Sequence, residues 1–327
     1  MAALAGLSPA AVSRFLNGGL HLPEETARRI RAAVAELDYR PSPLGRRLSL
    51  GRSDTLGLVL PDIANPFFAA LADAVQAEAE AQGQDLLLCA TRNRLGRELD
   101  DLARLQRADA DGVLFVTNHA DDGTLATAIA RHGQALVLLD EDVAGARVPK
   151  VFADNLAGGR LAAEHLLAAG HRRLALLGGP PGVMSAAERA AGFRSAVTAG
   201  GGAVVFEAAG DYLAAAGHAA GLRLLAMAEP PTAAFASSGE TALGLLLAAR
   251  ERGVAVPGRL SVVAFDDVGP MGLMQPPLTA IRQPVAEMGR QGVALLLARL
   301  RGGPVPQAPL RLPVELIARG SVAPPGC

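Results

Sequence analysis

Ten side chains with the chemistry to bind a small solute follow apolar runs in the sequence. They combine carboxylates, an amide, hydroxyls, aromatic rings and one guanidinium: Asp62, Asn65, Phe67, Phe68, Thr91, Asp140, Arg189, Tyr212, Ser238 and Asp266. Aromatic rings stack on other rings, carboxylates accept hydrogen bonds from hydroxyl groups, and a guanidinium donates two hydrogen bonds side by side. The set predicts a site for a polyhydroxylated or ring-shaped solute.

The elements that must hold these side chains alternate from Thr55 onward. Strands are predicted at residues 55–60, 85–90, 112–117, 135–140, 151–153, 173–178, 203–207, 232–236, 260–265 and 311–317. Helices are predicted between them at residues 65–83, 96–108, 122–131, 156–169, 185–199, 213–228, 240–252 and 283–300. Near-continuously apolar strands separated by helices indicate parallel sheets covered on both faces.

About nine strands precede residue 280, which is too many for one small sheet and favours two doubly wound lobes. Ligands of such proteins bind between the lobes, at the carboxyl ends of the strands, where the ten side chains are expected. We expect the chain to cross back between the lobes at residues 280–284.

A second kind of chemistry is concentrated in the first 53 residues, which hold eight arginines and four acids. The charge of this segment is +4 (8 − 4), whereas the whole chain carries −1, so the remainder carries −5. A basic segment on an acidic body favours a polyanionic partner. A solvated helical face would give the same imbalance, so charge alone leaves both interpretations open.

The same segment contains no strand pattern. Ser8-Pro9 starts a helix that runs to Leu16, because a hydroxyl caps a first turn and proline fits the first helical position. A second helix starts at Pro23 and runs to about Leu37, and two prolines then mark a linker. Gly6 permits a sharp turn before the first of these helices, and Arg14 has the reach to contact O6 and N7 of a guanine.

These motifs resemble the lactose-repressor family of bacterial transcription regulators. The helix-turn-helix pattern of that family is roughly G-V-S-x-x-T-V-S-R-V-L-N, and residues 6–17 read GLSPAAVSRFLN. Further motifs of the family follow in order at residues 24–30, 37–41, 62–68, 154–155, 170–173, 189–193, 265–267 and 276–284. One such motif is weak, but this series spans the whole chain.

The resemblance implies a small all-α helix-turn-helix head and an α/β, two-lobed, doubly wound parallel-sheet body of the periplasmic-binding-protein-like class. It divides the chain into a DNA-binding domain at residues 1–40, a hinge helix or linker at 41–53 and an effector-binding and dimerisation domain at 54–327. It implies a homodimer that binds operator DNA as a repressor, under the control of a sugar, polyol or nucleobase effector.

The resemblance also implies roles for single residues. In the head, Ser8 would cap a helix and contact a phosphate, and Pro9, Ala10 and Arg14 would face the bases. In the linker, Arg46 and Arg47 would neutralise phosphates and Leu48 would wedge into the minor groove. In the body, Phe67 and Phe68 would line the pocket from the first lobe, although one of the two rings is expected to belong to the core, and Arg189 and Asp266 would grip the effector from the second.

The chain departs from the family in three places. Gly45 replaces a usual alanine in the hinge, which costs a helix about 1 kcal/mol. Ser238-Gly239 replaces a usual Asn-Asp, so one polar anchor is shorter and one acid is lost. Only five residues precede the turn at Gly6, so we expect an N-terminally truncated head whose true start lies upstream, or one that senses ligand but binds DNA poorly.

Two other functions fit the sequence less well. An enzyme is disfavoured because no G-x-G-x-x-G follows a strand and neither a phosphate loop nor G-x-S-x-G occurs, so no catalytic residue and no cofactor are predicted.

A solute-binding protein of a transport system would share the body but carry a signal peptide and no basic head. No signal peptide and no apolar run of about 20 residues is found, and two cysteines make neither a disulfide framework nor a zinc site. We therefore expect a cytoplasmic protein with no membrane partner.

Overall fold

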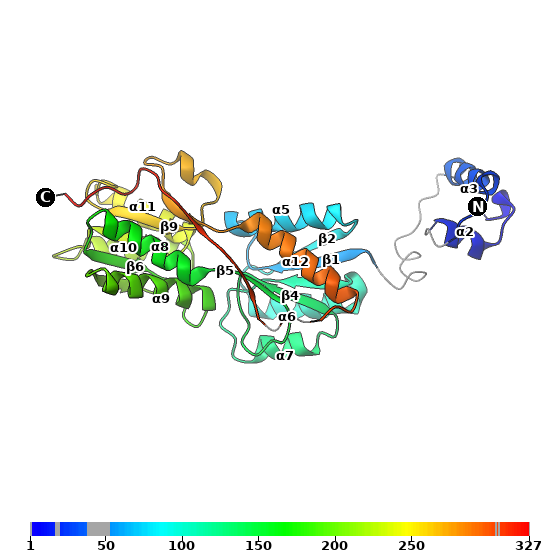
Figure 1. Ribbon diagram of the computed structural model, residues 1–327, viewed down its shortest axis with the longest axis horizontal. Helices are drawn as coiled ribbons and strands as arrows, with labels where there is room; N and C mark the ends of the chain where they lie inside the picture. The colour runs from blue at the N-terminus through cyan, green and yellow to red at the C-terminus, as the bar shows by residue number, and fades with distance from the viewer. Residues whose placement is uncertain (1, 17–19, 38–52, 305, 307, 327) are drawn as a thin grey trace.

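The computed structural model describes residues 2–16, 20–37, 53–304, 306 and 308–326. Figure 1 shows a small helical head and a body of two α/β lobes. Over these residues no helix has both the length and the apolar character needed to cross a membrane.

The head consists of α1 (Ala2–Ala5), α2 (Pro9–Leu16) and α3 (Glu24–Glu36). The side chains of Ala5, Val12 and Ile30 meet in its buried apolar cluster, which joins all three helices. The predicted helices at residues 9–16 and 23–37 are confirmed, and so is the turn at Gly6, whose φ of 66° favours glycine.

The first lobe is built on a six-stranded sheet in the order β11-β5-β4-β3-β1-β2, with every pair parallel. Its strands are β1 (Thr55–Leu60), β2 (Asp85–Ala90), β3 (Gly112–Phe115), β4 (Ala135–Leu139), β5 (Lys150–Ala153) and β11 (Leu310–Leu312). Its helices are α5 (Pro66–Ala81), α6 (Leu95–Arg104), the π-helical η1 (Leu105–Asp109), α7 (Thr124–Arg131) and α12 (Val285–Leu300).

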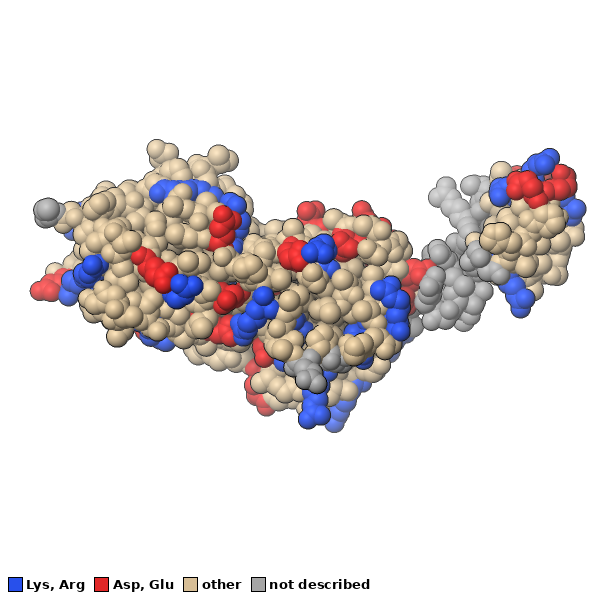
Figure 2. Space-filling view, viewed as in Figure 1, with Lys and Arg blue, Asp and Glu red and all other residues tan. Residues whose placement is uncertain are grey.

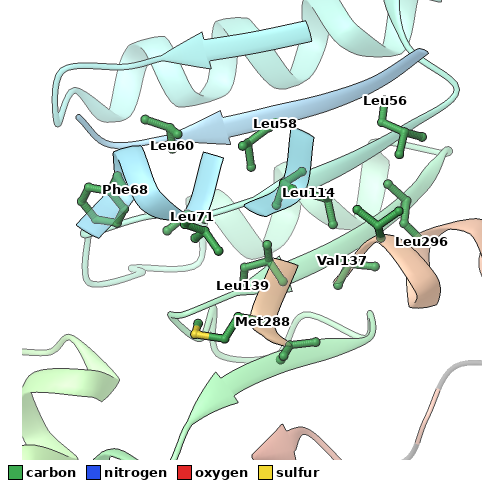
Figure 3. Packing of buried hydrophobic residues seen from close by; sticks show 14 of the residues in the cluster. Leu56, Leu58, Leu60, Phe68, Leu71, Leu114, Val137, Leu139, Met288 and Leu296 are labelled. Carbon is green, nitrogen blue, oxygen red and sulfur yellow. The ribbon is translucent and has the colours of Figure 1, made fainter. Parts of the chain in front are cut away.

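Side chains on alternate residues of β1 enter two different cores. Leu56, Leu58 and Leu60 pack with α5 and α12 (Figure 3), whereas Val59 packs with α6, η1 and α7. Successive side chains of a strand point to opposite faces, so helices must cover both faces of this sheet. Because both faces of the sheet are covered, nearly every residue of its strands is apolar, and this explains the near-continuous apolar runs in the sequence.

The second lobe repeats the arrangement with the order β12-β10-β9-β8-β6-β7, in which only the β12–β10 pair is antiparallel. Its strands are β6 (Arg173–Leu177), β7 (Ala203–Ala208), β8 (Ala233–Ala236), β9 (Ser261–Phe265), β10 (Thr279–Arg282) and β12 (Glu315–Ile317). Its helices are α8 (Asn155–Ala168), α9 (Met184–Ala199), α10 (Ala214–Leu225), α11 (Gly239–Glu251) and the short 3₁₀ helix η2 (Gly269–Leu273).

The chain passes between the lobes three times: after β5, after β10 and between β11 and β12. The predicted recrossing at residues 280–284 is confirmed. The prediction of one last strand at 311–317 is wrong, because the two residues after Leu312 carry the chain from the first sheet to the second. The strand β10 was not predicted, and the helix predicted at 96–108 divides into α6 and η1.

Candidate functional site

The site between the lobes begins with the close packing of α8 on α9. A Cβ atom on Gly159 would lie 2.0 Å from the carbonyl oxygen of Arg189, and one on Gly192 would lie 2.0 Å from that of Leu156. No side chain fits at such distances, so glycine lets the two backbones touch. This approach brings Asn155, the first residue of α8, to the side chain of Arg189 in α9.

Arg189 is a buried cation held by its own lobe, with 3% of its surface exposed. Its Nε donates to Oδ1 of Asn155 and its terminal nitrogen to the carbonyl oxygen of Ser237, both at 2.8 Å. Its guanidinium carbon lies 3.7 Å from the centroid of the Phe265 ring and 5.6 Å from that of Tyr212. Two hydrogen bonds and two rings fix this charge in one orientation.

Two aspartates at the ends of central strands face this charge. Asp140 follows β4 and Asp266 follows β9, and both have positive φ angles (66° and 71°), which aspartate tolerates better than most residues. Oδ1 of Asp266 accepts a hydrogen bond from Nε2 of Gln283 at 2.7 Å, whereas Oδ1 of Asp140 is buried without a partner. Burial raises the pKa of Asp140 to about 7; the charge of Arg189 opposes this rise, and the carboxylates of Glu141 and Asp266 add to it.

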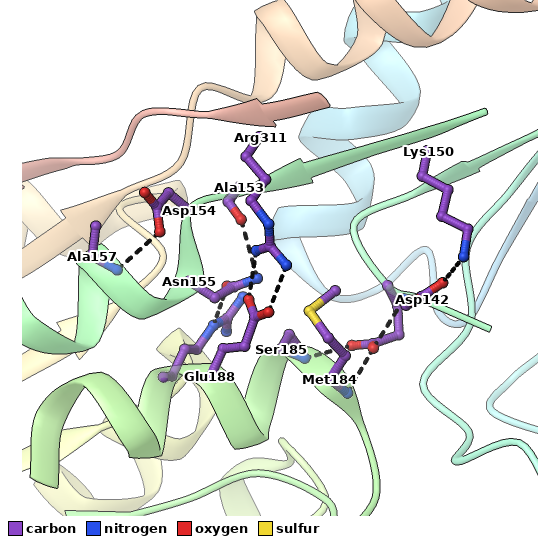
Figure 4. Close-up of polar contacts among 12 residues, drawn as sticks. Asp142, Lys150, Ala153, Asp154, Asn155, Ala157, Met184, Ser185, Glu188 and Arg311 are labelled. Carbon is purple, nitrogen blue, oxygen red and sulfur yellow. Dashed lines mark hydrogen bonds and ion pairs between the residues drawn. The ribbon is translucent and has the colours of Figure 1, made fainter. Parts of the chain in front are cut away.

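Glu141 is a carboxylate of the first lobe that caps a helix of the second. It is 1% exposed and accepts hydrogen bonds from the backbone N–H groups of Met184 at 2.7 Å and Ser185 at 3.1 Å (Figure 4). These are the first residues of α9, and the residue before them, Val183, supplies no side-chain cap. A carboxylate at a helix N-terminus satisfies free N–H groups and the helix dipole, so this contact joins the lobes.

A second polar contact crosses the lobes nearby. Arg311 on β11 of the first sheet donates to both carboxylate oxygens of Glu188 on α9, at 2.7 and 2.6 Å (Figure 4). A cavity of only about 30 Å³ lies between the lobes beside Asn65, Glu240 and Asp266. These contacts hold the two lobes against each other beside this cavity.

The other predicted residues of the second lobe have structural partners. Tyr212 is buried beneath Gly179, and its hydroxyl lies 3.3 Å from Oγ of Ser185. Ser238 caps α11 by accepting a hydrogen bond from the N–H of Thr241 at 3.2 Å.

In the first lobe, Phe67 and Phe68 are 4% and 3% exposed and pack in the apolar core under α5, in the first turn of that helix. This packing fits the core role that was expected for one of the two rings, and a role in lining the effector pocket stays a prediction. Asn65 caps α5 by accepting from the N–H of Phe67 at 2.9 Å, and Thr91 is fully buried at the end of β2.

Asp62 follows β1 and accepts a hydrogen bond from the N–H of Ala64. The carboxylate of Asp62 acts across the cleft on Glu240 at the start of α11. Burial and the charge of Asp62 together raise the pKa of Glu240. Asp154 caps α8 by accepting from the N–H of Ala157 at 3.0 Å.

Sequence reasoning missed Glu141, Gln283 and the contact of Asn155 with Arg189. Glu141 directly follows Asp140 at a strand end, so its position in the sequence could have identified it as a candidate site residue. Its partners lie more than 40 residues away in α9, which the sequence did not reveal.

The head presents the predicted base-facing residues on an open surface. Pro9, Ala10 and Arg14 are exposed on α2, and Oγ of Ser8 accepts from the N–H of Ala11 at 3.2 Å. On the face shown in Figure 2, acidic and basic side chains are interspersed over the two lobes. Arg46, Arg47 and Leu48 lie outside the described residues.

Comparisons with known proteins cover the same two parts of the chain. Residues 1–42 match the bacterial regulatory proteins of the lacI family, and residues 163–322 match a periplasmic binding protein-like domain. The HTH-type transcriptional repressor CytR of Escherichia coli (strain K12) is 32% identical over 322 residues, which are 97% of this chain and 93% of that protein. The ribose operon repressor of Bacillus subtilis (strain 168) is 32% identical over 98% of this chain and 96% of that protein.

Among solved structures, the lac repressor dimer bound to operator and the anti-inducer ONPF superposes with a TM-score of 0.89 at 28% identity, over 98% of this chain and 97% of that one. A complex of the transcriptional regulator CelR with cellobiose gives a TM-score of 0.76 at 31% identity, over 98% of both chains.

Proposed function

Because the chain belongs to the lacI family of bacterial regulatory proteins, we infer that it is a ligand-responsive transcriptional repressor that binds operator DNA as a homodimer. It is not an enzyme, since its relatives are repressors. The observation that carries this function is a match to repressors that runs through head and body together. A transport protein would match in the body alone, so that alternative is not supported.

For the division of labour along the chain, we propose a DNA-binding head at residues 1–40, a hinge at 41–53 and an effector-binding and dimerisation body at 54–327. The match of residues 1–42 to the family supports the first boundary. Strand β1, which begins at Thr55, supports the second boundary. A repressor acts on chromosomal DNA, so we place this protein in the cytoplasm.

Within the head, α2 is the proposed recognition helix. Its exposed residues Pro9, Ala10 and Arg14 face the bases, while Val12 is turned into the core of the head. Ala10 is short and apolar and suits a thymine methyl group, whereas the guanidinium of Arg14 suits O6 and N7 of guanine. Ser8 contacts a phosphate, Arg46 and Arg47 neutralise others, and Leu48 wedges into the minor groove.

Within the body, the effector binds between the lobes against Arg189, Asp140 and Asp266. The support is geometric: a fixed cation, two strand-end carboxylates and buried acceptors meet where the lobes close. An effector that changes closure also moves Glu141 against α9 and Arg311 against Glu188. The two hinges of a dimer then change their spacing, with a coupling free energy of about 1–3 kcal/mol.

The test is selection of DNA duplexes from a random pool by the full chain. Duplexes with two related half-sites should be enriched, and Arg14→Ala should lose sequence preference at one position of each half-site, at a cost of about 1–3 kcal/mol. Arg28→Ala is the matched control, because Arg28 lies on α3 rather than on the recognition helix and its exposed side chain pairs with Glu25. Absence of any enriched sequence, with or without metabolites, would refute the proposed function.

A further inference from the structure

A carboxyl group that the proposed effector site does not use is buried in the first lobe. Glu98, in the first turn of α6, is fully buried, although glutamate is rarely buried without a charged partner. Its Oε2 accepts a hydrogen bond at 2.9 Å from the hydroxyl of Thr117, which follows β3, whereas its Oε1 has no hydrogen-bond partner. Buried polar atoms without partners are rare in folded proteins, so the position of Glu98 calls for an explanation.

The unpartnered atom of Glu98 faces a second one. Nε2 of His119 is also buried without a hydrogen-bond partner, and it lies 3.8 Å from Oε1 of Glu98. This distance is about 1 Å too long for a hydrogen bond, so a small movement of either side chain would join the two atoms. The backbone of His119 is already tied to the same carboxylate, because its N–H donates at 3.0 Å to the hydroxyl of Thr117.

Proton uptake changes the charge of this pair. An ionised Glu98 beside a neutral imidazole leaves one negative charge in the interior, which is unfavourable. One proton from the solvent, held by Oε1 or by Nε2, brings the net charge of the pair to zero and favours a hydrogen bond between the two atoms. Burial raises the pKa of Glu98 to about 7, against a smaller opposing effect of the Thr117 hydrogen bond, so this change falls near neutral pH.

Charged groups on the surrounding elements are neutral, exposed or engaged elsewhere. On α7, which packs on α6, burial lowers the pKa of His132, against the opposing effect of a hydrogen bond with the backbone of Leu102. After β3, Asp121 and Asp122 accept hydrogen bonds from backbone N–H groups at the start of α7. The other charged side chains of α6 and of the loop before it are exposed or paired with each other: Arg92, Arg94, Arg97, Asp100, Asp101 and Arg104.

The loop that carries His119 touches the second lobe. A Cβ atom on Gly182 would lie 2.8 Å from Cβ of Ala120, the residue after His119, so Ala120 packs directly against this glycine. Gly182 stands just before α9, whose first N–H groups are capped by Glu141 of the first lobe. A change in the position of His119 therefore reaches the contact between the lobes.

We propose that Glu98 and His119 form a proton switch that makes the contact between the two lobes depend on pH. With one proton in the pair, the loop after β3 is held to α6 and supports the contact of Ala120 with Gly182. Without that proton, the negative charge draws water toward Glu98, and both the loop and this contact loosen. The inference goes beyond the proposed function and holds whatever the effector is.

Amide hydrogen exchange of the full chain, followed by mass spectrometry, tests the switch on two segments: residues 117–123 of the first lobe and residues 178–185 of the second. Glu98→Gln keeps the shape of the side chain and its hydrogen-bonding capacity but has no proton to release. Its exchange rate at each pH is therefore the reference, and dividing by it cancels the intrinsic pH dependence of exchange.

The rate of the unaltered chain divided by that of Glu98→Gln should rise by up to about tenfold from pH 6 to pH 8 in both segments. The reason is that local opening at pH 8 releases an ionised carboxylate from the interior, which the variant lacks.

Two further variants complete the test. Glu229→Gln makes the same chemical change on a side chain that is 83% exposed, and it should exchange like the unaltered chain in both segments at both pH values. His119→Ala removes the imidazole, so both segments should exchange several-fold faster than in the unaltered chain at pH 6.

The outcomes decide the proposal separately from the proposed function. A ratio that is the same at pH 6 and pH 8 would overturn the switch, and so would a normal rate for His119→Ala at pH 6. A pH-dependent ratio confined to residues 117–123 would show that Glu98 stabilises only its own lobe, which also overturns the proposal. Operator binding is tested independently by the selection of duplexes.

Discussion

The two lobes share one architecture but bring different parts to the site. The strand order β2-β1-β3-β4-β5-β11 of the first lobe corresponds to β7-β6-β8-β9-β10-β12 of the second. In the second lobe, Arg189 is fixed by Asn155 and Ser237 of the same lobe. In the first lobe, Asp140 has an unpaired oxygen, and Glu141 accepts hydrogen bonds both from the N–H of Asp142 in its own lobe and from Met184 and Ser185 across the cleft.

This difference indicates a division of roles within the body. The second lobe holds a cation that is oriented by its own lobe, whereas Glu141 of the first lobe gains two of its partners from the second. Separation of the lobes would remove these two partners of Glu141 but leave the hydrogen bonds of Arg189 in place.

Phe68→Ala tests whether the first lobe offers aromatic rings to the effector. Phe68 is 3% exposed in the core under α5, so truncation should lower the free energy of unfolding by about 3–5 kcal/mol. Chemical denaturation measures this change. Effector affinity, corrected for the folded fraction, should stay the same; a large loss of affinity with little loss of stability would favour the pocket-lining interpretation.

Asp140→Asn tests how much burial of the Asp140 carboxyl group destabilises the folded protein. Because its pKa is raised to about 7, folded Asp140 keeps its proton between about pH 4 and pH 7, where the unfolded chain has released it. The stability of the ligand-free protein therefore falls as pH rises through this window, by up to about 4 kcal/mol from this residue.

The variant lacks this titration, so its advantage over the unaltered chain should be small at about pH 4 and largest at about pH 8. Denaturation series at several pH values measure the difference, in which the contribution from Glu98 cancels because both proteins contain it. A difference that does not vary with pH would contradict the burial argument.

Arg189→Met tests the fixed cation of the second lobe. Methionine keeps much of the packing against Phe265 but removes the charge and both hydrogen bonds. Effector affinity should fall about a hundredfold, which is near 3 kcal/mol, while operator binding without effector is retained. Titration calorimetry and gel-shift assays report the two activities, and a retained effector response would remove Arg189 from the site.

Glu141→Ala tests the contact that joins the lobes and has the smallest expected effect. Loss of the cap on α9 should cost about 1–2 kcal/mol and open the lobes, so small-angle scattering should show a larger radius of gyration. Asp121→Ala removes a cap within the first lobe, at α7, and serves as the matched control because it should leave closure unchanged. Equal radii for both variants would show that Glu141 does not hold the lobes together.

Much of the fold followed from local pattern. Apolar runs and helical periodicity predicted nearly every helix and central strand of the body, because a parallel sheet buried on both faces requires that composition. The exceptions are three strands of three or four residues: β11 and β12 at the sheet edges, and β10 next to β12. Their pairing depends on chain crossings rather than on their own sequence. Phe67 and Phe68 show a related limit, since a motif gives their position but not the face of α5 that carries them inward.

The amino-acid sequence by itself determined the helical head, the alternation of strands and helices, the presence of Asp140 and Asp266 directly after strands, and that of Arg189 near the start of a helix. Each of these depends on residue type and short-range spacing. Only the tertiary structure decided that Glu141 caps α9, that Asn155 orients Arg189 and that the cleft is left with unpaired acceptors. Those contacts join residues 34 to 44 positions apart, and their strength comes from burial, which exists only when the lobes are packed together.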